Sequence, residues 1–345
     1  MSGSPVAHDI AAVMHGGNLH EAARRYGIDY DAWIDLSTGI NPHGYPVPPL
    51  PASAWRRLPD DGDGFAAAAA RYYGVDDARC VLPVAGSQAA IRALPLLLPA
   101  ARTAIASLTY GEYLRAFVRA AHPVVPLEPA WDAIPDGIVH AVVVTPNNPT
   151  TARIAPSRLL QWHAQLLARR GTLIVDETFA DALPDAAQAS VAVHAGREGL
   201  VVLRSPGKFF GLAGARCGFV LGHPALLDTL RDELGPWTVS GPARHAVLHA
   251  FADSAWQREM RVRLANESAR LAALLREHGL EPHATPLFAW VVDSRAAMLQ
   301  HALAQQGIWT RWFAEPTSLR FGLPDSEAAW QRLAYALSAW ARKLI

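Results

Sequence analysis

The chain has 345 residues, of which 51% are hydrophobic, so it is long enough to bury a large core, and we expect two lobes. Acidic and basic residues balance at 31 each, which argues against a surface built for nucleic acid or an anionic membrane. Cys80 and Cys217 show no metal-ligand spacing, and the N-terminus lacks a basic region followed by an apolar stretch. These features predict a globular, cytoplasmic protein that acts on small molecules and uses no metal.

Residues 1–50 are typical of an arm and not of a domain. The stretch His15-Gly16-Gly17-Asn18 precedes a helix predicted over residues 19–26. On local grounds the two glycines mark a turn as readily as a binding site. Prolines interrupt regular structure after residue 41, at Pro42, Pro46, Pro48, Pro49 and Pro51.

Strand-like and helical segments alternate beyond the arm. The predicted helices cover residues 65–74, 89–98, 112–121 and 156–169, and the predicted strands cover 81–84, 103–108, 140–145, 172–175 and 200–203. Strands that alternate with helices and form continuous runs of Val, Ile and Leu indicate a mainly parallel sheet covered on both faces. The sequence therefore predicts an α/β fold.

Polar and small residues gather where these predicted strands end. They are Gly86, Tyr110, Asn148, Asp176 and Lys208. Ligands of parallel sheets bind at the carboxyl ends of the strands, and a turn that opens a helix offers backbone N–H groups to a phosphate. We expect the functional site at this edge of the sheet.

Lys208 is one of only two lysines, and the other, Lys343, is third from the C-terminus. Arginine keeps its proton in proteins, whereas a desolvated lysine beside other cations can lose one and attack a carbonyl. If the chemistry needs an amine, Lys208 supplies it. On position alone, a surface lysine without function is the alternative.

The pattern changes after Trp237. A helix predicted over 242–277 leads to strands over 287–293, 309–313 and 318–322, with a helix over 296–306 and another at the C-terminus. This arrangement predicts a smaller α/β lobe, with the substrate in the cleft between lobes. The expected organisation is an arm over 1–50, a large cofactor domain over 51–236 and a small domain over 237–345.

Six motifs in order resemble the fold-type I enzymes that use pyridoxal 5'-phosphate, in the class I and II aminotransferase family. They are Gly86-Ser87-Gln88, Tyr110, Asn147-Asn148-Pro149, Asp176-Glu177, Ser205 to Lys208, and Arg216. The resemblance covers nearly the whole chain. It implies a large domain whose mainly parallel central sheet is flanked by helices, a smaller C-terminal α/β domain, and a homodimer.

The resemblance also implies the role of each residue toward the cofactor. Lys208 would bond to the cofactor aldehyde and move protons, and Asp176 would keep the pyridine nitrogen protonated. Tyr110 would stack on the ring and Asn148 would donate to its O3'. The cofactor phosphate would rest on Gly86, Ser87, Gln88 and Ser205, with a charged contact from Arg216. Without the resemblance, Asp176 fits a helix N-cap, Tyr110 a core aromatic and Asn148 a turn.

A narrower resemblance is to the branch of this family that decarboxylates L-threonine O-3-phosphate, a phosphorylated amino acid, for cobalamin biosynthesis. The residues that carry it are His15 to Asn18, Asp35 to Pro42 and Pro236 to Val239. It implies a substrate site made of His15 and Arg311 for the phosphate, Asn18 in support, Gly39 for close backbone approach, Asn148, and Arg320 for the α-carboxylate.

Histidinol-phosphate aminotransferase, or a related aminotransferase, is the alternative. Those relatives carry a tyrosine where this chain has Phe179, and Tyr-Pro where it has Leu58-Pro59. The phenylalanine fits the decarboxylase branch. A regulator on the same fold would carry an added basic module, for which the chain has neither the length nor the charge.

Overall fold

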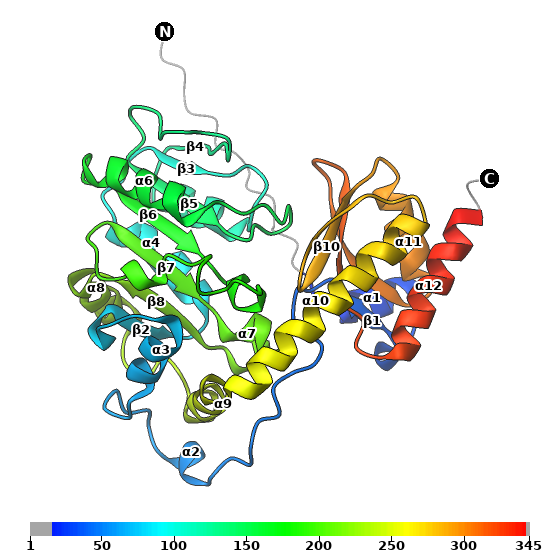
Figure 1. The fold of residues 1–345 in the computed structure, drawn as a ribbon, viewed down its shortest axis with the longest axis horizontal. Helices are drawn as coiled ribbons and strands as arrows, with labels where there is room; N and C mark the ends of the chain where they lie inside the picture. The colour runs from blue at the N-terminus through cyan, green and yellow to red at the C-terminus, as the bar shows by residue number, and fades with distance from the viewer. Residues whose placement is uncertain (1–15, 343–345) are drawn as a thin grey trace.

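The computed structural model describes residues 16–342, which form two lobes with a sheet in each (Figure 1). The larger sheet has the order β2 (Val81–Val84), β8 (Gly218–Gly222), β7 (Leu200–Arg204), β6 (Thr172–Asp176), β5 (His140–Val144), β3 (Thr103–Ile105) and β4 (Val124–Pro126). The strands from β7 to β4 are parallel, whereas β8 is antiparallel to both of its neighbours. The mainly parallel sheet predicted from the sequence is confirmed.

Helices cover both faces of this sheet because its strands are apolar on both sides. Alternate side chains of a strand point to opposite faces. On β7, Val201 and Leu203 pack with α4 (Ser87–Leu97), α5 (Glu112–Arg119) and α8 (Pro224–Leu234). Leu200 and Val202 pack with α3 (Phe65–Tyr73), α6 (Pro156–Leu167) and α9 (Gly241–Ala252).

The smaller sheet has the order β1 (Ile34–Leu36), β11 (Ile308–Phe313), β12 (Ser318–Gly322), β10 (Phe288–Val292) and β9 (Pro282–Thr285). Helices α10 (Ser254–Glu277), α11 (Ala296–Ala304) and α12 (Glu327–Arg342) pack against it, and α1 (Leu19–Tyr26) lies nearby. The other helices are the short α2 (Ser53–Arg56) and α7 (Pro206–Phe209), with 3-10 turns at Tyr30–Ala32, Ala78–Cys80, Ala180–Ala182, Ala192–His194 and Ala213–Ala215.

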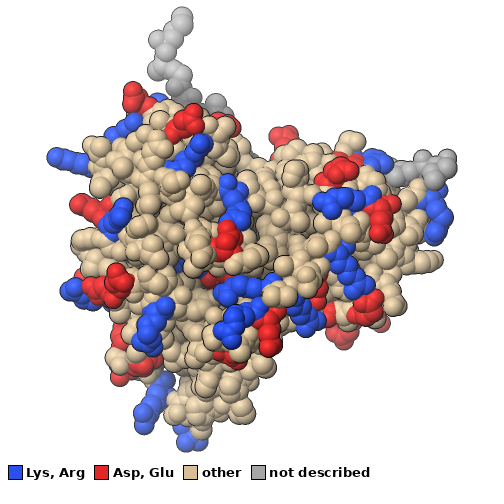
Figure 2. Space-filling model, in the orientation of Figure 1, with Lys and Arg blue, Asp and Glu red and all other residues tan. Residues whose placement is uncertain are grey.

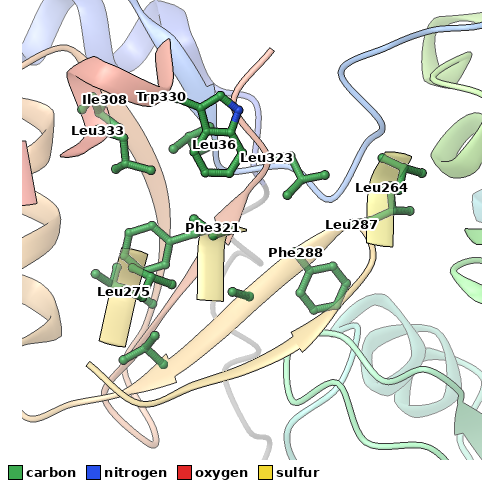
Figure 3. Close-up of a cluster of buried hydrophobic side chains, with 14 of the residues drawn as sticks. Leu36, Leu264, Leu275, Leu287, Phe288, Ile308, Phe321, Leu323, Trp330 and Leu333 are labelled. Atoms are coloured by element: carbon green, nitrogen blue, oxygen red, sulfur yellow. The ribbon is translucent and has the colours of Figure 1, made fainter. Parts of the chain in front are cut away.

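The arm supplies a strand to the small lobe, which the sequence did not predict. β1 runs parallel to β11, with Ile34 opposite Ile308 and Leu36 opposite Thr310. Leu36 is fully buried, and Figure 3 shows it among core side chains that include Trp330 of α12. The predicted domain boundaries at residues 50 and 236 stay predictions.

The single helix predicted over residues 242–277 is wrong. The chain breaks at Asp253, between α9 and α10. The Asp253 carboxylate accepts a hydrogen bond from the Trp256 backbone N–H at 2.9 Å, and a side chain that caps a helix N-terminus in this way starts a new helix. In Figure 1, α10 begins beside α9 and crosses to the small lobe.

The strand predicted over residues 103–108 is shorter than expected, because β3 ends at Ile105 and not at residue 108. The side-chain amide of Asn147 donates to the Leu108 carbonyl at 2.9 Å, which takes that backbone group away from the sheet.

Acidic and basic side chains lie interspersed over both lobes on the face drawn in Figure 2. Neither sign dominates that face, as the balanced composition predicts. Within residues 16–342, every helix is too short or too polar to span a bilayer.

Candidate active site

A cavity with about 740 Å³ of empty space, part of it open to solvent, lies at the carboxyl ends of the parallel strands. Its lining includes every residue that the sequence assigned to the cofactor: Gly86, Ser87, Gln88, Tyr110, Asn148, Asp176, Ser205, Lys208 and Arg216. The structure thus brings together residues from a span of more than a hundred positions.

Lys208 lies on the short helix α7, directly after strand β7. Burial lowers the pKa of its amine to about 8, and the positive charges of Arg320 and Arg216 act in the same direction against the Asp176 carboxylate. The amine lies 5.6 Å from the centre of the Phe179 ring. A substantial fraction of the amine is therefore neutral near pH 8, as a nucleophile must be.

Asp176 is the last residue of β6 and is only 4% exposed. Its carboxylate accepts hydrogen bonds from the Tyr113 hydroxyl at 2.7 Å and from the Thr178 backbone N–H at 2.9 Å. Burial and the Asp176 charge raise the pKa of Tyr113 well above its usual value, so this hydroxyl stays a donor. The sequence did not lead us to assign a role to Tyr113, although its place three residues after Tyr110 suggests that both face the same site.

Gly86 and Arg216 also line the cavity. Gly86 has a positive φ of 78°, and a Cβ atom there would lie 2.9 Å from Nη2 of Arg216. Only glycine lets the guanidinium approach the turn that opens α4. A helix N-terminus beside a guanidinium forms an anion site.

Tyr110 and Gln88 are held together beside this anion site. The Tyr110 hydroxyl donates to Oε1 of Gln88 at 2.9 Å, and Nε2 of Gln88 donates to Glu112 at 2.7 Å. Burial raises the pKa of Tyr110 to about 12, so its ring carries a neutral hydroxyl at physiological pH.

Arg320 comes from the small lobe, on strand β12, and is 6% exposed. Its guanidinium donates to Oδ1 of Asn148 and, at 2.5 Å, to the carbonyl of Ser37, while its Nε is buried without a hydrogen-bond partner among residues 16–342. Burial, with the nearby charge of Arg311, lowers the pKa of Arg320 to about 10. Arg311 stands opposite Arg320 on β11, and residues directly opposite in an antiparallel pair share a face.

Of the N-terminal residues predicted to bind substrate, the structure describes Asn18 and Gly39. His15 lies outside the described residues, and Asn18 donates to Glu21 at 2.5 Å and does not line the cavity. Gly39 is buried between two rings, since a Cβ atom there would lie 3.0 Å from both Phe179 and Phe288.

The start of the described chain nevertheless reaches the neighbourhood of Arg320. The Gly17 backbone N–H donates to Oγ of Ser37 at 2.7 Å, and a Cβ atom on Gly16 would lie 2.4 Å from the Ser37 carbonyl oxygen. That carbonyl binds Arg320. The segment that follows His15 is therefore packed against a partner of Arg320.

A buried ion network lies behind the cavity and was not predicted. Arg204, the last residue of β7, donates to Glu177 and Asp181, and its guanidinium lies 4.5 Å from the centre of the Tyr73 ring. Although burial alone lowers the pKa of Arg204, the two carboxylates outweigh it and raise the pKa. The network ties the end of β7 to the residue after Asp176, so it fixes the spacing between β6, which ends at Asp176, and β7, which precedes the helix that carries Lys208.

These groups fit pyridoxal 5'-phosphate. An amine with a lowered pKa, a buried carboxylate with fixed partners, and an anion site at a glycine turn match the aldehyde, ring nitrogen and phosphate of that molecule.

Comparison with known proteins identifies relatives along nearly the whole chain. The model of the family described as aminotransferase class I and II matches residues 59–337. A threonine-phosphate decarboxylase of Pseudomonas aeruginosa is 50% identical over 325 residues, which are 94% of this chain and 96% of that protein. Another from Sinorhizobium sp. is 43% identical over 95% of this chain and 98% of that protein.

A solved structure supports the fold. Histidinol-phosphate aminotransferase of Sinorhizobium meliloti, in complex with pyridoxal 5'-phosphate, matches with a TM-score of 0.79 over the whole of both chains. Its sequence identity to this chain is 18%, so the likeness concerns the fold alone.

Proposed function

The chain belongs to the class I and II aminotransferase family, and within it we propose that it is a pyridoxal 5'-phosphate-dependent threonine-phosphate decarboxylase. It would convert L-threonine O-3-phosphate to (R)-1-amino-2-propanol O-2-phosphate and carbon dioxide for cobalamin biosynthesis. The observation that carries this proposal is the 50% identity, over 94% of the chain, to the Pseudomonas aeruginosa enzyme of that name.

Two arginines of the small lobe, next to the cavity, have charges that suit this substrate. Threonine phosphate carries a carboxylate and a phosphate. Arg320 binds Asn148 in the cavity wall, and Arg311 stands opposite Arg320 on the neighbouring strand, close enough for its charge to act on Arg320. Arg320, whose Nε lacks a partner among the described residues, would take the carboxylate, and Arg311 would take the phosphate. His15, Asn18 and Gly39 would complete the phosphate side.

The cofactor would be held by the groups on the large-lobe side. Lys208 would bind its aldehyde, Asp176 its ring nitrogen and Asn148 its ring oxygen, with Tyr110 on the ring face. Gly86, Ser87, Gln88, Ser205 and Arg216 would hold its phosphate. When bound, pyridoxal 5'-phosphate supplies a sink for the electron pair that the departing carboxylate leaves behind.

The chain's own groups then handle the substrate and one proton. Arg320 would orient the carboxylate that leaves as carbon dioxide. Lys208 would donate a proton to the substrate Cα in its place, and a pKa of about 8 would let the amine both give and regain a proton near neutral pH. Phe179 keeps the neighbourhood of the amine apolar, since its ring lies beside the amine and packs on Phe288.

The test is to incubate the purified protein, loaded with pyridoxal 5'-phosphate, with L-threonine O-3-phosphate and no keto acid. We expect carbon dioxide and aminopropanol phosphate in equal amounts, and neither from Lys208→Ala. If no carbon dioxide forms, but histidinol phosphate and 2-oxoglutarate yield glutamate, the decarboxylase proposal is wrong and the protein is an aminotransferase.

We also propose that the enzyme is a cytoplasmic homodimer. Large apolar side chains are exposed on the large lobe, with Trp55 69%, Leu58 65% and Trp237 57% accessible. Exposed apolar groups of this size are typical of surfaces that bind another chain. Two free buried cysteines, Cys80 and Cys217, fit a reducing compartment. Light scattering after size exclusion tests the dimer, and a monomer that keeps full activity would contradict it.

A further inference from the structure

The helix that carries Lys208 cannot hold its own position. α7 contains four residues, Pro206–Phe209, and a single helical turn is not stable by itself in water. The last carbonyls of a helix have no partner within it, so other groups must bind them. What binds these carbonyls therefore decides how firmly Lys208 is placed.

Asn41, from the N-terminal arm, binds two consecutive carbonyls of this turn. Its backbone N–H donates to the Lys208 carbonyl at 3.0 Å, and its Nδ2 donates to the Phe209 carbonyl at 2.8 Å. The remaining side-chain oxygen accepts from the His43 backbone N–H at 2.8 Å. Asn41 is 2% exposed, so its amide has a fixed orientation in a buried place.

The arm continues along the turn after Asn41. The Tyr45 backbone N–H donates to the Phe210 carbonyl at 2.8 Å. Gly211 has a positive φ of 65°, and a Cβ atom there would lie 2.6 Å from Cα of Gly44 and 2.8 Å from the Asn41 carbonyl oxygen. The two backbones are in direct contact, so residues 41–45 act as a splint for the turn.

The splint also connects Lys208 to the substrate side. Four residues before Asn41, the Ser37 carbonyl accepts a hydrogen bond from Arg320. Between them, Gly39 packs against the Phe179 ring, which lies beside the Lys208 amine. The same nine-residue segment, 37–45, therefore contacts both a group proposed for the substrate and the turn proposed for the cofactor.

We propose that Asn41 is a positioning residue for Lys208: its backbone and side-chain amides hold the turn that carries the lysine and so fix the amine between Arg320, Asp176 and Arg216. Asn41 itself touches neither substrate nor cofactor. This inference rests on the proposed function only in that Lys208 is the residue that binds pyridoxal 5'-phosphate.

Loosening the turn has a definite consequence for the amine. A mobile turn lets the amine leave its desolvated place near Arg320 and Arg216, so the proton is held more tightly and fewer molecules carry the neutral form. Attack on the cofactor aldehyde then becomes slower at neutral pH. Binding of the substrate carboxylate by Arg320 is affected less.

The test compares Asn41→Asp and Asn41→Ser with the wild type. Asn41→Asp keeps the shape of the side chain and the oxygen that accepts from the His43 backbone N–H, but it loses the N–H donor to the Phe209 carbonyl. The Asn41→Ser side chain is too short to reach that carbonyl and adds no charge. His43→Gln is the matched control, because it breaks the contact of the His43 ring with Glu267 on α10 but leaves the backbone bond to Asn41. Pyridoxal 5'-phosphate is added to each apoprotein, and the visible band of the lysine-bound cofactor is followed between pH 6.5 and 9.5.

We expect both Asn41 variants to bind cofactor about 3- to 10-fold more slowly at pH 7.5, the range for one lost hydrogen bond. The pH midpoint of the rate should shift upward, and kcat should fall more than KM rises. His43→Gln should stay within about twofold of the wild type, since the contact that it breaks, with Glu267 on α10, does not reach the turn that carries Lys208.

Equal rates and midpoints in the wild type and both Asn41 variants would overturn the proposal. So would an equal slowing in His43→Gln, because the effect would then belong to the arm as a whole. Thermal melting of each apoprotein identifies any unfolded variant, and the better folded of the two Asn41 variants decides. If the wild type releases no carbon dioxide, the proposed function fails, but the rates of cofactor binding still test Asn41.

Discussion

The proposed site has a cofactor side, which is the cavity, and a substrate side around Arg320, and the two differ in how they are built. The cofactor side comes from turns in one lobe, and its groups have partners within the fold, such as Tyr113 for Asp176 and Gln88 for Tyr110. The substrate side is assembled from both ends of the chain, with Ser37 from the arm and Arg320 from β12. There the Nε of Arg320 is buried without a partner among residues 16–342.

This difference shows which half is complete before a ligand arrives. A buried donor without an acceptor costs free energy, which an incoming carboxylate can recover. Under the proposed function, the cofactor side is preorganised, whereas on the substrate side an anion would supply the acceptor that the Nε of Arg320 lacks among residues 16–342. Changes to the cofactor side should therefore alter mainly kcat, and changes to the substrate side should alter mainly KM for the substrate.

Lys208→Ala should have the largest effect. Among residues 16–342, Lys208 supplies the only amine that lines the cavity. Removing it should lower carbon dioxide release by about 10⁴-fold or more, since both covalent attachment and proton transfer are lost. The visible band of the lysine-bound cofactor should disappear as well. Lys208→Arg is the control, because it keeps a positive charge but cannot lose the proton. Activity above a few per cent in either variant would assign the chemistry to another group.

Arg320→Lys should have the second largest effect, and this effect should be on the substrate side. A lysine keeps the charge but cannot fork onto a carboxylate while still binding Asn148 and Ser37. We expect KM for threonine phosphate to rise about 10- to 100-fold, as for loss of a charged hydrogen bond, with the cofactor band unchanged. Arg295→Lys, in the same lobe and paired with Asp293, is the control. A fall in kcat with KM unchanged would place Arg320 on the chemical side instead.

Changing the pH should have an effect of intermediate size on the rate at which the apoprotein attaches the cofactor. Because the pKa of Lys208 is lowered to about 8, the neutral fraction of the amine should rise about tenfold between pH 7 and pH 9 and then level off. A lysine with the ordinary pKa of 10.5 would continue to gain reactivity beyond pH 9. Stopped-flow absorbance of the apoprotein mixed with pyridoxal 5'-phosphate measures this. No plateau by pH 9.5 would mean that the amine is not desolvated.

Tyr113→Phe should have the smallest effect, because it removes one donor to Asp176 and leaves the Thr178 N–H in place. We expect kcat to fall about 3- to 10-fold, while KM changes little. Steady-state rates of carbon dioxide release measure both. Tyr110→Phe loses a bond to Gln88 and not to Asp176, so it serves as the comparison. A larger effect on KM than on kcat would show that Asp176 serves the substrate side.

The sequence predicted the parallel strands and the residues at their ends, because each signal there is local. Apolar runs such as residues 200–203 mark buried strands, and Asp176 and Lys208 follow them directly. Gly16, Gly17 and Arg320 carry no such local signal, and the structure brings them together at Ser37 through long-range packing. Tyr113, Arg204 and Asn41 were not assigned roles because their partners lie on other elements.

Some short strands could not be predicted from local patterns in the sequence. β1 and β4 have three residues each, too few for a periodic pattern to appear. β8 was obscured by glycines, although Gly218 is required there, since a Cβ atom would lie 2.7 Å from the Ser87 backbone nitrogen. A hydrophobic pattern does not reveal such close approaches.

The pairing of β1 with β11 fixes an order of events during protein synthesis. Ile34 pairs with Ile308, and at 5–20 residues per second the ribosome needs roughly 14 to 55 s to make the chain between them. Throughout that time Leu36, which is fully buried in the finished protein, has no sheet to enter. β1 is made early and paired late, so a nascent chain can complete the large sheet before the small sheet gains its edge strand.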